Sequence, residues 1–400
     1  MIWYRVQIGA YAIKKSAENV SVDLIEKGFK TSVTKEGLLY KVRVGSFQDK
    51  SKAEKLLARV HEHEKYKKAK ILEWNDGKDL PIIDISGGNE DKKEENKENY
   101  HPKFCFYAIW LTESCESRYG DAQVFIEYAE NGVDFAHVVL VDTGMNGTDT
   151  IKKLKKLGIK TLDAVVISHA HGDHYGYLSE VLKQFKVLHL YLPGIAGLLK
   201  YQKDYAKAIQ NQEKKAKKLG IPVTYLDDIY NNSRAEFTVG HINCWCACQV
   251  PASALKEHDN HHFVNNQSIV TLFTLDNCGR VLLSGDLSNP GNSWVMEHIK
   301  KSAITADIAK CGWHGDGNAM TEAWAKFVDA VVWYWNYHHK ESQGGRGNTR
   351  KKLEKAGVKK DHILRNFEDG DILCAFSQGV WVIQTSKSKK SFSFKSKFSK

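Results

Sequence analysis

The chain has 400 residues, a formal net charge of +10 and a hydrophobic content of 42%. This length predicts two or more domains with a sizeable core, and the positive charge favours acidic partners such as nucleic acid or anionic wall polymers. No apolar run reaches the roughly 18 residues that a membrane span needs. The opening MIWYRVQIGAY lacks the basic and apolar regions of a signal peptide, so we expect no membrane span and synthesis in the cytoplasm.

The N-terminal part of the chain contains an internal repeat, YRVQIGAYAIKKSAENV from Tyr4 and YKVRVGSFQDKSKAEKL from Tyr40. Each copy begins with alternating apolar residues, turns at a glycine and continues with helical spacing. Two more strand-like runs, 30–36 and 68–74, complete the order β-α-β-β-α-β. The pattern therefore predicts a ferredoxin-like α+β domain over residues 1–75, with one four-stranded sheet and two helices on one face.

This segment resembles a SPOR domain on the residues WYRVQIGAY, AENV, GFKTSVTKEGLLYKVRVGSF and AEKLL. SPOR domains bind peptidoglycan glycan strands stripped of peptide, using the open face of the sheet. The resemblance implies that Gln7 and Arg43 lie on that face, with Tyr11 and Phe47 near the strand ends. Amide and aromatic side chains suit sugars, although Tyr11 and Phe47 are equally well interpreted as core residues.

Two segments are charged and poor in aliphatic side chains. Residues 76–103 include GGNEDKKEENKENYHPK, which cannot bury enough surface to order itself and predicts a disordered linker. Residues 386–400 carry the basic run SKSKKSFSFKSKFSK, which we interpret as a disordered, solvated tail. The alternative is a polybasic arm with interleaved phenylalanines that touches polyanions.

The alternating cysteines of CWCAC point to one face of a strand, and there they favour a buried thiol stripe over a metal site. The cysteines are Cys244, Cys246 and Cys248.

The run 167-ISHAHGDHYGYL-178 gathers three histidines and an aspartate in one short loop. A buried strand is predicted within 160–168 and a helix over 176–185, so the loop lies at the carboxyl end of a strand, where α/β sheets place their sites. Two imidazoles at i and i+2 can chelate one cation, and an aspartate and a histidine that follow closely can turn toward another. The pattern predicts a metal site.

The loop resembles the H-x-H-x-D-H signature of the metallo-β-lactamase fold, which is met by His169, His171, Asp173 and His174. The resemblance covers roughly residues 104–385 and implies that fold's four-layer αβ/βα sandwich. Later landmarks follow in the family's order. VDTG implies that Asp142 and Gly144 support the metal loop, VLLSGDLS implies a bridging carboxylate, Asp286, and IAKCGWHGD implies a late ligand, His314.

A subfamily is indicated by NNQSIVTLFTLDNCGRVLLSGD, by AKCGWHG and by the closing FEDGDILCAFSQGVWVI. These runs resemble the β-lactamase-fold domain of competence DNA-internalisation (ComEC-like) proteins and of related exported hydrolases. The subfamily's double histidine reads Trp313-His314 here, so one imidazole is missing. A mid-domain histidine ligand is not evident: His241 is one candidate, and His338 or His339 in WNYHHK could reach the cleft.

The resemblance implies two divalent cations, zinc in the first instance and manganese as the alternative. His169 and His171 would hold one cation. The other would lie between Asp173, His174 and His314, with Asp286 as the bridge. A bridging hydroxide would attack the electrophile, and the catalytic residues would be Asp173, Asp286 and His314.

Together these features predict a metal-dependent phosphodiesterase or nuclease of bacterial or phage origin, tethered to peptidoglycan and acting on DNA or a teichoic-acid-like polymer. The alternatives are a catalytically inactive peptidoglycan-binding protein and an amide or lactam hydrolase of wall components. A wall-binding domain without a leader calls for another route to the wall. Release by cell lysis, a leader omitted from the start of the chain, or a different ligand inside the cell would each supply an explanation.

Overall fold

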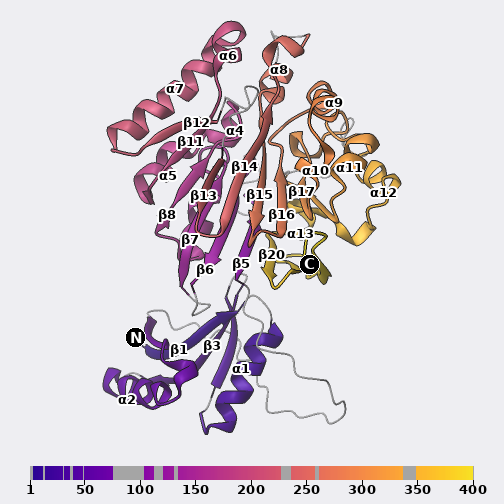
Figure 1. Ribbon diagram of the computed structural model, residues 1–400. Coiled ribbons are helices and arrows are strands. Elements are labelled where there is room, and N and C mark those ends of the chain that lie inside the picture. The colour runs from indigo at the N-terminus through magenta and orange to yellow at the C-terminus, as the bar shows by residue number, and fades with distance from the viewer. Residues whose placement is uncertain are drawn as a thin grey trace. The chain divides into compact units, whose positions relative to one another are not determined.

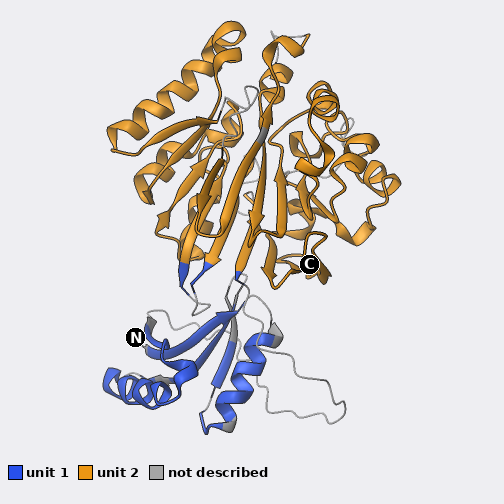
Figure 2. Ribbon diagram, viewed as in Figure 1, with its two compact units in different colours: residues 1–103, 128–135 blue, residues 104–127, 136–400 orange. Residues whose placement is uncertain are grey.

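The computed structural model describes residues 3–11, 14–29, 31–36, 39–47, 49–74, 103–111, 120–129, 134–226, 236–256, 261–336 and 348–399. The chain forms two compact units, one made of residues 1–103 with 128–135 and the other of residues 104–127 with 136–400 (Figures 1 and 2). The predicted linker, 76–103, falls almost wholly outside the described residues. Within the described ranges, no helix has both the length and the apolar character that crossing a bilayer requires.

Unit 1 has the predicted order of elements. They are β1 (Trp3–Tyr11), α1 (Lys14–Glu26), β2 (Thr31–Glu36), β3 (Leu39–Phe47), α2 (Lys50–His61), the 3-10 helix η1 (Glu64–Tyr66) and β4 (Lys70–Trp74). The sheet has the strand order β2-β3-β1-β4 and is antiparallel throughout. The β-α-β-β-α-β prediction is therefore confirmed.

The glycine-x-aromatic step of the repeat is a packing motif. A Cβ placed on Gly9 would lie 2.5 Å from the hydroxyl oxygen of Tyr11, and one on Gly45 would lie 2.5 Å from the Phe47 ring. Each aromatic ring thus lies over the backbone of the glycine two residues before it. Because only glycine leaves room for the ring, both copies of the repeat keep the same pair.

Three of the four predicted glycan contacts are buried in this structure. Tyr11 is 4% exposed and belongs to the hydrophobic core of unit 1, and this burial raises the pKa of its hydroxyl. Gln7 and Arg43 lie directly opposite one another on β1 and β3, but both are buried as well. The core interpretation of Tyr11 is therefore confirmed, while the assignment of Gln7 and Arg43 as glycan contacts on the open face stays a prediction. Phe47 is partly exposed.

Unit 2 contains two large sheets. The nine-stranded sheet runs in the order β12 (Val223–Leu226), β11 (Leu190–Pro193), β9 (Ala164–Val166), β7 (Phe135–Val141), β6 (Gln123–Tyr128), β5 (Phe104–Ala108), β20 (Ile372–Ser377), β21 (Val380–Thr385), β22 (Ser391–Lys395). The seven-stranded sheet runs β13 (Glu236–Val239), β14 (Ile242–Gln249), β15 (Ile269–Leu275), β16 (Gly279–Leu283), β17 (Ile308–Lys310), β18 (Val332–Trp335), β19 (Ile363–Arg365). A small parallel pair joins β8 (Thr161–Leu162) to β10 (Lys186–Val187).

The two large sheets share one core. Phe125 of β6 stacks on Phe273 of β15 with ring centroids 4.1 Å apart, and buried apolar residues of both sheets belong to the same cluster. The three cysteines of CWCAC lie on β14, buried and free, as predicted. The core thus fixes the two sheets face to face, so that loops from both can meet at one edge.

Helices flank the two sheets on both sides (Figure 1). Those that follow strands of the nine-stranded sheet are α3 (Thr150–Lys156), α4 (Gly172–Tyr175), α5 (Leu178–Gln184), α6 (Ala196–Tyr201) and α7 (Lys203–Lys218). The others are α8 (His261–Asn266), α9 (Asn289–His298), α10 (Lys301–Ile304), α11 (Glu322–Val328), α12 (Thr349–Lys355) and α13 (Asn366–Asp369). Short 3-10 helices are η2 (Ala252–Ala254), η3 (Trp313–Gly315) and η5 (Lys360–His362).

The basic tail is ordered, and the prediction of a disordered tail is wrong. Its SFSFK run forms β22, which pairs with β21 at the edge of the nine-stranded sheet. Phe392 and Phe394 alternate with outward-facing serines and pack against the core. Beyond the strand, Ser396 Oγ and Lys397 N donate hydrogen bonds to the fully buried carboxylate of Asp307, at 2.8 and 3.0 Å.

Removal of residues 389–400 should lower the free energy of unfolding of unit 2 by about 2–4 kcal/mol, because a buried carboxylate loses two donors and two phenylalanines lose their contacts. Chemical denaturation of the full-length and truncated chains measures this. Lys395→Ala, which changes an exposed side chain of the same strand, is the control and should leave the midpoint unchanged. A truncated chain as stable as the full-length one would show that the tail contributes nothing to the fold.

Candidate metal centre

The histidine loop is tied to the strand beside it through Asp142. This residue follows β7 and has a positive φ of 57°. Its carboxylate accepts hydrogen bonds from Ser168 N at 2.8 Å and from Ser168 Oγ at 2.7 Å. Ser168 follows β9, so the two neighbouring strand ends are joined where the loop begins. A neighbouring strand end thus fixes the loop on which the predicted ligands lie.

His174 is fully buried and held by the same carboxylate. Its Nδ1 donates to Asp142 Oδ2 at 2.8 Å, and its backbone carbonyl accepts from both Thr143 N and Thr143 Oγ1. These contacts leave Nε2 pointing at Asp286, whose Oδ2 lies 3.3 Å away. A histidine that donates through one nitrogen to a carboxylate is oriented to bind a metal through the other nitrogen. Against the effect of burial, Asp286 and Asp142 raise the pKa of His174 well above 6.5, so a cation that binds Nε2 would displace a proton from it.

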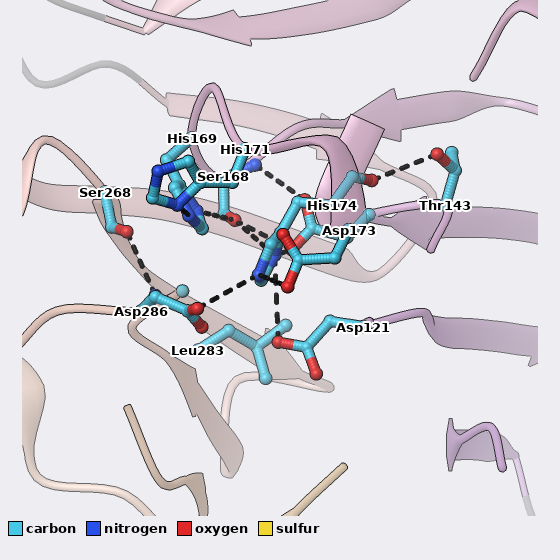
Figure 3. A network of polar contacts seen from close by, with 12 residues as sticks. Asp121, Thr143, Ser168, His169, His171, Asp173, His174, Ser268, Leu283 and Asp286 are labelled. Atoms are coloured by element: carbon cyan, nitrogen blue, oxygen red, sulfur yellow. Dashed lines mark hydrogen bonds and ion pairs between the residues drawn. The ribbon is translucent and has the colours of Figure 1, made fainter. Parts of the chain in front are cut away.

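Two residues from distant parts of the chain meet this loop. Asp286 follows β16, and its backbone N–H donates to Ser268 Oγ. His314 lies in η3 with a positive φ of 49°, and its Nδ1 is 3.1 Å from the carbonyl oxygen of Asn336. His314 Nε2 lies 2.9 Å from Asp173 Oδ2 and 3.1 Å from Asp286 Oδ2. Figure 3 shows Asp173, His174 and Asp286 turned toward one another.

His169 and His171 form a second group beside the first. His169 Nε2 is 3.0 Å from His171 Nδ1, and the rings of His169 and His174 lie 4.1 Å apart. Ser168 Oγ uses its proton on Asp142, so it accepts from His169 Nδ1 at 3.1 Å. His169 therefore carries its proton on Nδ1 and directs the lone pair of Nε2 toward His171.

Two buried charges at the centre were not identified from the sequence. Asp121 precedes β6, and its Oδ2 lies 2.6 Å from the ammonium nitrogen of Lys310. Lys310 closes β17; its Nζ also lies 3.3 Å from Asp286 Oδ1 and donates to the Gly285 carbonyl at 2.6 Å. Asp121 and Lys310 are 0% and 1% exposed. The only sequence signal was a Gly-Asp pair just before the apolar run of 123–128, which lacks a spacing that marks a ligand.

The charges in this cluster balance one another. Burial alone would raise the pKa of Asp121, but Lys310 and His314 outweigh it and lower the pKa to about 2. Burial opposes ionisation of Asp286 too, yet His314, His174 and Lys310 hold its pKa well below the ordinary value. Burial lowers the pKa of His169 far below 6.5, so its imidazole is neutral. Carboxylates stay charged and His169 keeps a lone pair, as metal binding requires.

The residues present fit a divalent cation. Ligand atoms of Asp121, His174, Asp286 and His314 all lie within 4.8 Å of one another, and all four residues are buried. Asp121 is already paired with Lys310 at 2.6 Å, so it supports the cluster rather than binding the cation. Nε2 of His174 forms no hydrogen bond of good geometry to a described residue and faces Asp286 Oδ2 at 3.3 Å, so both atoms are directed at the place that a cation would occupy. A donor set of imidazole and carboxylate suits zinc or manganese.

The further candidate ligands, His241, His338 and His339, do not join this cluster in the described part of the chain. His241 lies in the turn before β14, and its ring contacts Glu127 at 2.5 Å. The opposite end of β14 approaches the site, so the prediction of His241 as a ligand is wrong. His338 and His339 lie outside the described residues. Trp313 stands where the subfamily has a histidine, and its ring lies 4.7 Å from that of His262.

Gly120 should be intolerant of any side chain. It has φ +133°, and a Cβ there would lie 1.9 Å from the carbonyl oxygen of Asp173. Gly120→Ala must therefore displace Asp121 or the metal loop, with a loss of about 1–3 kcal/mol from backbone strain alone and weaker cation binding. Gly220→Ala is the matched control, since Gly220 has φ +73° with nothing within 4 Å. Equal cation affinity in both variants would contradict the proposed contact.

Family comparisons agree with these two units. Residues 135–243 match the metallo-beta-lactamase superfamily, and residues 4–72 match the SPOR domain. ComE operon protein 3 of Bacillus subtilis (strain 168) is 29% identical over 165 residues, which make up 41% of this chain and 18% of that protein. The chain thus spans less than a fifth of that relative's length.

Solved structures show partial likeness. The peptidoglycan-binding domain of the B. subtilis cell wall lytic enzyme CwlC is 32% identical, covering 19% of this chain and 92% of that chain with a TM-score of 0.18. A diphosphatase of the PhnP family is 13% identical, covering 65% and 94% with a TM-score of 0.37. An isothiocyanate hydrolase from Delia radicum gut bacteria is 12% identical, covering 68% and 99% with a TM-score of 0.39.

Proposed function

Because the chain joins an N-terminal SPOR domain to a metallo-beta-lactamase superfamily domain, we propose that it is a metal-dependent hydrolase, and specifically a phosphodiesterase or nuclease, anchored to peptidoglycan. The observation that carries this proposal is the convergence of Asp173, His174, Asp286 and His314 at one buried point. To the same domain we assign the four-layer αβ/βα order, which the shared core of the two sheets and the flanking helices support.

The ligand assignment follows from which atoms face one another. His169 and His171 would hold one cation. Another would lie between Asp173, His174 and His314, with Asp286 shared between the two positions. The shared role is supported by the proximity of Asp286 to both groups, since its charge acts on the pKa of His169 and of His174. Such a pair of cations would act as a Lewis acid and lower the pKa of water in the site.

The other charged residues of the site have separate roles in the proposed reaction. Asp173 keeps 14% of its side chain exposed, more than Asp286 or either histidine that faces it, so it is the carboxylate that meets solvent and substrate. We assign it the orientation of the attacking water through its free carboxylate oxygen. Lys310 and Asp121 stay behind the ligands, where their ion pair fixes Asp286 and His314 in place.

The substrate follows from the anchor and from charge. A SPOR domain supports peptidoglycan binding, and a tether to the wall raises the local concentration of substrate without tighter binding at the active site. The net charge of +10 favours a polyanion, DNA or a teichoic-acid-like polymer. Wall association through the SPOR domain requires release or export, for which cell lysis is one route.

Metal analysis followed by a substrate panel tests the proposal. Purified full-length protein should contain about two equivalents of zinc or manganese and hydrolyse bis-p-nitrophenyl phosphate, with DNA and teichoic acid as polymer substrates. Chelation should abolish turnover and re-addition of the metal should restore it. Protein without metal or turnover would instead be a wall-binding protein without activity. Hydrolysis of nitrocefin or muropeptides in preference to the diester would indicate an amide or lactam hydrolase.

A further inference from the structure

The first cation position lacks an evident third protein ligand. His169 and His171 offer one nitrogen each, and the only mid-domain histidine singled out in the sequence, His241, is at the wrong end of β14. The segment that runs beside this position is Asn265–Ser268, because Ile269 N donates to the carbonyl of Ser168, next to His169. The third ligand should therefore be sought among these four residues.

Three of the four side chains are already engaged. Asn266 donates to Ser288 Oγ and to the His262 carbonyl, while its Oδ1 accepts from Ser288 N and Gly291 N. Gln267 donates through Nε2 to the carbonyl of Val250, and its Oε1 lies against Gly197, where an added Cβ would be 2.5 Å away. Ser268 Oγ accepts from the backbone N–H of Asp286. These contacts hold the segment and the Asp286 loop together, and they exclude the three side chains as free ligands.

Asn265 differs from its neighbours. It is 1% exposed, yet neither Oδ1 nor Nδ2 forms a hydrogen bond of normal geometry to any residue that the structure describes. Its amide nevertheless faces the ring of His171, and this contact falls short of good hydrogen-bond geometry. A buried amide left with this single poor contact costs about 1–3 kcal/mol, and a cation bound by its oxygen would remove that cost.

We propose that the side-chain oxygen of Asn265 is the third protein ligand of the cation held by His169 and His171. The inference rests on the proposed two-cation site and adds one residue to it. An amide oxygen is a neutral, hard donor of the kind that binds manganese, magnesium and calcium. It therefore completes the position without adding negative charge to a site that already holds Asp286.

Equilibrium metal binding tests the proposal without relying on turnover. Zinc and manganese are titrated into the metal-free full-length chain, alone and against a chromophoric chelator. Asn265→Ala should weaken the weaker of the two sites by about ten-fold or more and leave the other unchanged. Asn265→Asp should restore binding, since a carboxylate oxygen replaces the amide oxygen. Gln212→Ala, the loss of a buried amide on α7, is the control and should bind both cations like the wild type.

Stability of the metal-free protein separates a ligand from a structural residue. If Asn265 is a ligand, metal-free Asn265→Ala should be at least as stable as the metal-free wild type, because an unsatisfied amide has been removed, and only the stabilisation by added metal should shrink. Two-site binding by Asn265→Ala with wild-type affinities would overturn this inference and leave the proposed function standing. A wild-type protein that binds no cation would overturn both.

Discussion

Replacing Asp173 by alanine should reduce hydrolysis of bis-p-nitrophenyl phosphate by at least about 100-fold while the fold stays intact. Its carboxylate is the partly exposed member of the cluster and lies 2.9 Å from His314 Nε2. Its loss removes both a ligand and the group assigned to the attacking water, and groups that act only on the transition state typically contribute 10²–10³-fold or more in rate. The free energy of unfolding should change little in Asp173→Ala, because the Asp173 side chain is not part of the hydrophobic core.

The measurement is steady-state turnover at saturating metal, with unfolding midpoints recorded for each variant. Asp204→Ala removes an exposed carboxylate from the first turn of α7 and should keep full activity. Asp173→Asn should behave like the alanine variant, since the amide keeps the shape but loses the charge. Turnover within a factor of two of the wild type in Asp173→Ala would rule out the proposed ligand set.

The contiguous motif was the part of the site most open to prediction. Strand, loop and helix around His169–His174 follow from apolar periodicity, and a dense group of ligand types in six residues has few other uses. Asp286 and His314 were identified through the family resemblance of the runs VLLSGDLS and IAKCGWHGD, since spacing alone does not connect them to the loop. The structure brings both residues to the loop. Asp286 Oδ2 lies 3.3 Å from His174 Nε2, and the ring centroids of His314 and His174 are 5.3 Å apart.

Asp121 and Lys310 were missed for a physical reason. A single acid before a strand and a single lysine at the end of another are most often solvated, and sequence spacing cannot show that two such residues meet in the interior. The pairing depends on the packing of the two large sheets, which carry β6 and β17, around their shared core, and this packing is a tertiary property. The same holds for the tail, where composition suggested disorder but the alternation of Phe392 and Phe394 allowed an edge strand.

Position along a strand explains the remaining errors. His241 lies just before the first residue of β14, and Gln249 is its last residue. Only the end at Gln249 approaches the metal centre. The sequence around a histidine in a turn does not show whether that end of the strand lies near the site. In unit 1, the resemblance to SPOR domains placed Gln7 and Arg43 on the open face of the sheet, but it could not show that both side chains are buried. Periodicity predicts the side of a sheet, whereas exposure depends on what else packs there.

Replacing Lys310 by methionine should cost about 3–5 kcal/mol of folding free energy in the metal-free protein. Methionine keeps most of the volume but removes the ammonium 2.6 Å from Asp121, leaving a fully buried carboxylate with only the more distant imidazoles of His314 and His174, at 3.5 and 3.7 Å. Breaking a buried ion pair on one side is costly because the remaining charge stays desolvated. Denaturant unfolding in the presence of a chelator measures the effect, and Lys301→Met, on an exposed helix position, is the control.

Removing the charges of both Lys310 and Asp121 should restore much of the folding free energy that Lys310→Met loses. Lys310→Met combined with Asp121→Asn leaves no uncompensated charge on this pair, so the double variant should be more stable than Lys310→Met alone, and the cycle should give a coupling energy of at least about 1 kcal/mol. A bound divalent cation should compensate in the same way. Zinc or manganese should therefore stabilise Lys310→Met more than it stabilises the wild type.

The pH dependence of the two proteins should differ as well. In the wild type the pKa of Asp121 is lowered from 3.8 to about 2, so this group contributes stability above pH 4 that is lost as the pH falls toward 2. Without Lys310, His314 and His174 alone oppose the effect of burial, so the pKa of Asp121 should be higher than in the wild type and the group should contribute less stability above pH 4. The difference in unfolding free energy between the wild type and Lys310→Met should therefore narrow as the pH falls from 4 toward 2; a constant difference would mean that the ion pair does not hold Asp121 in its charged form.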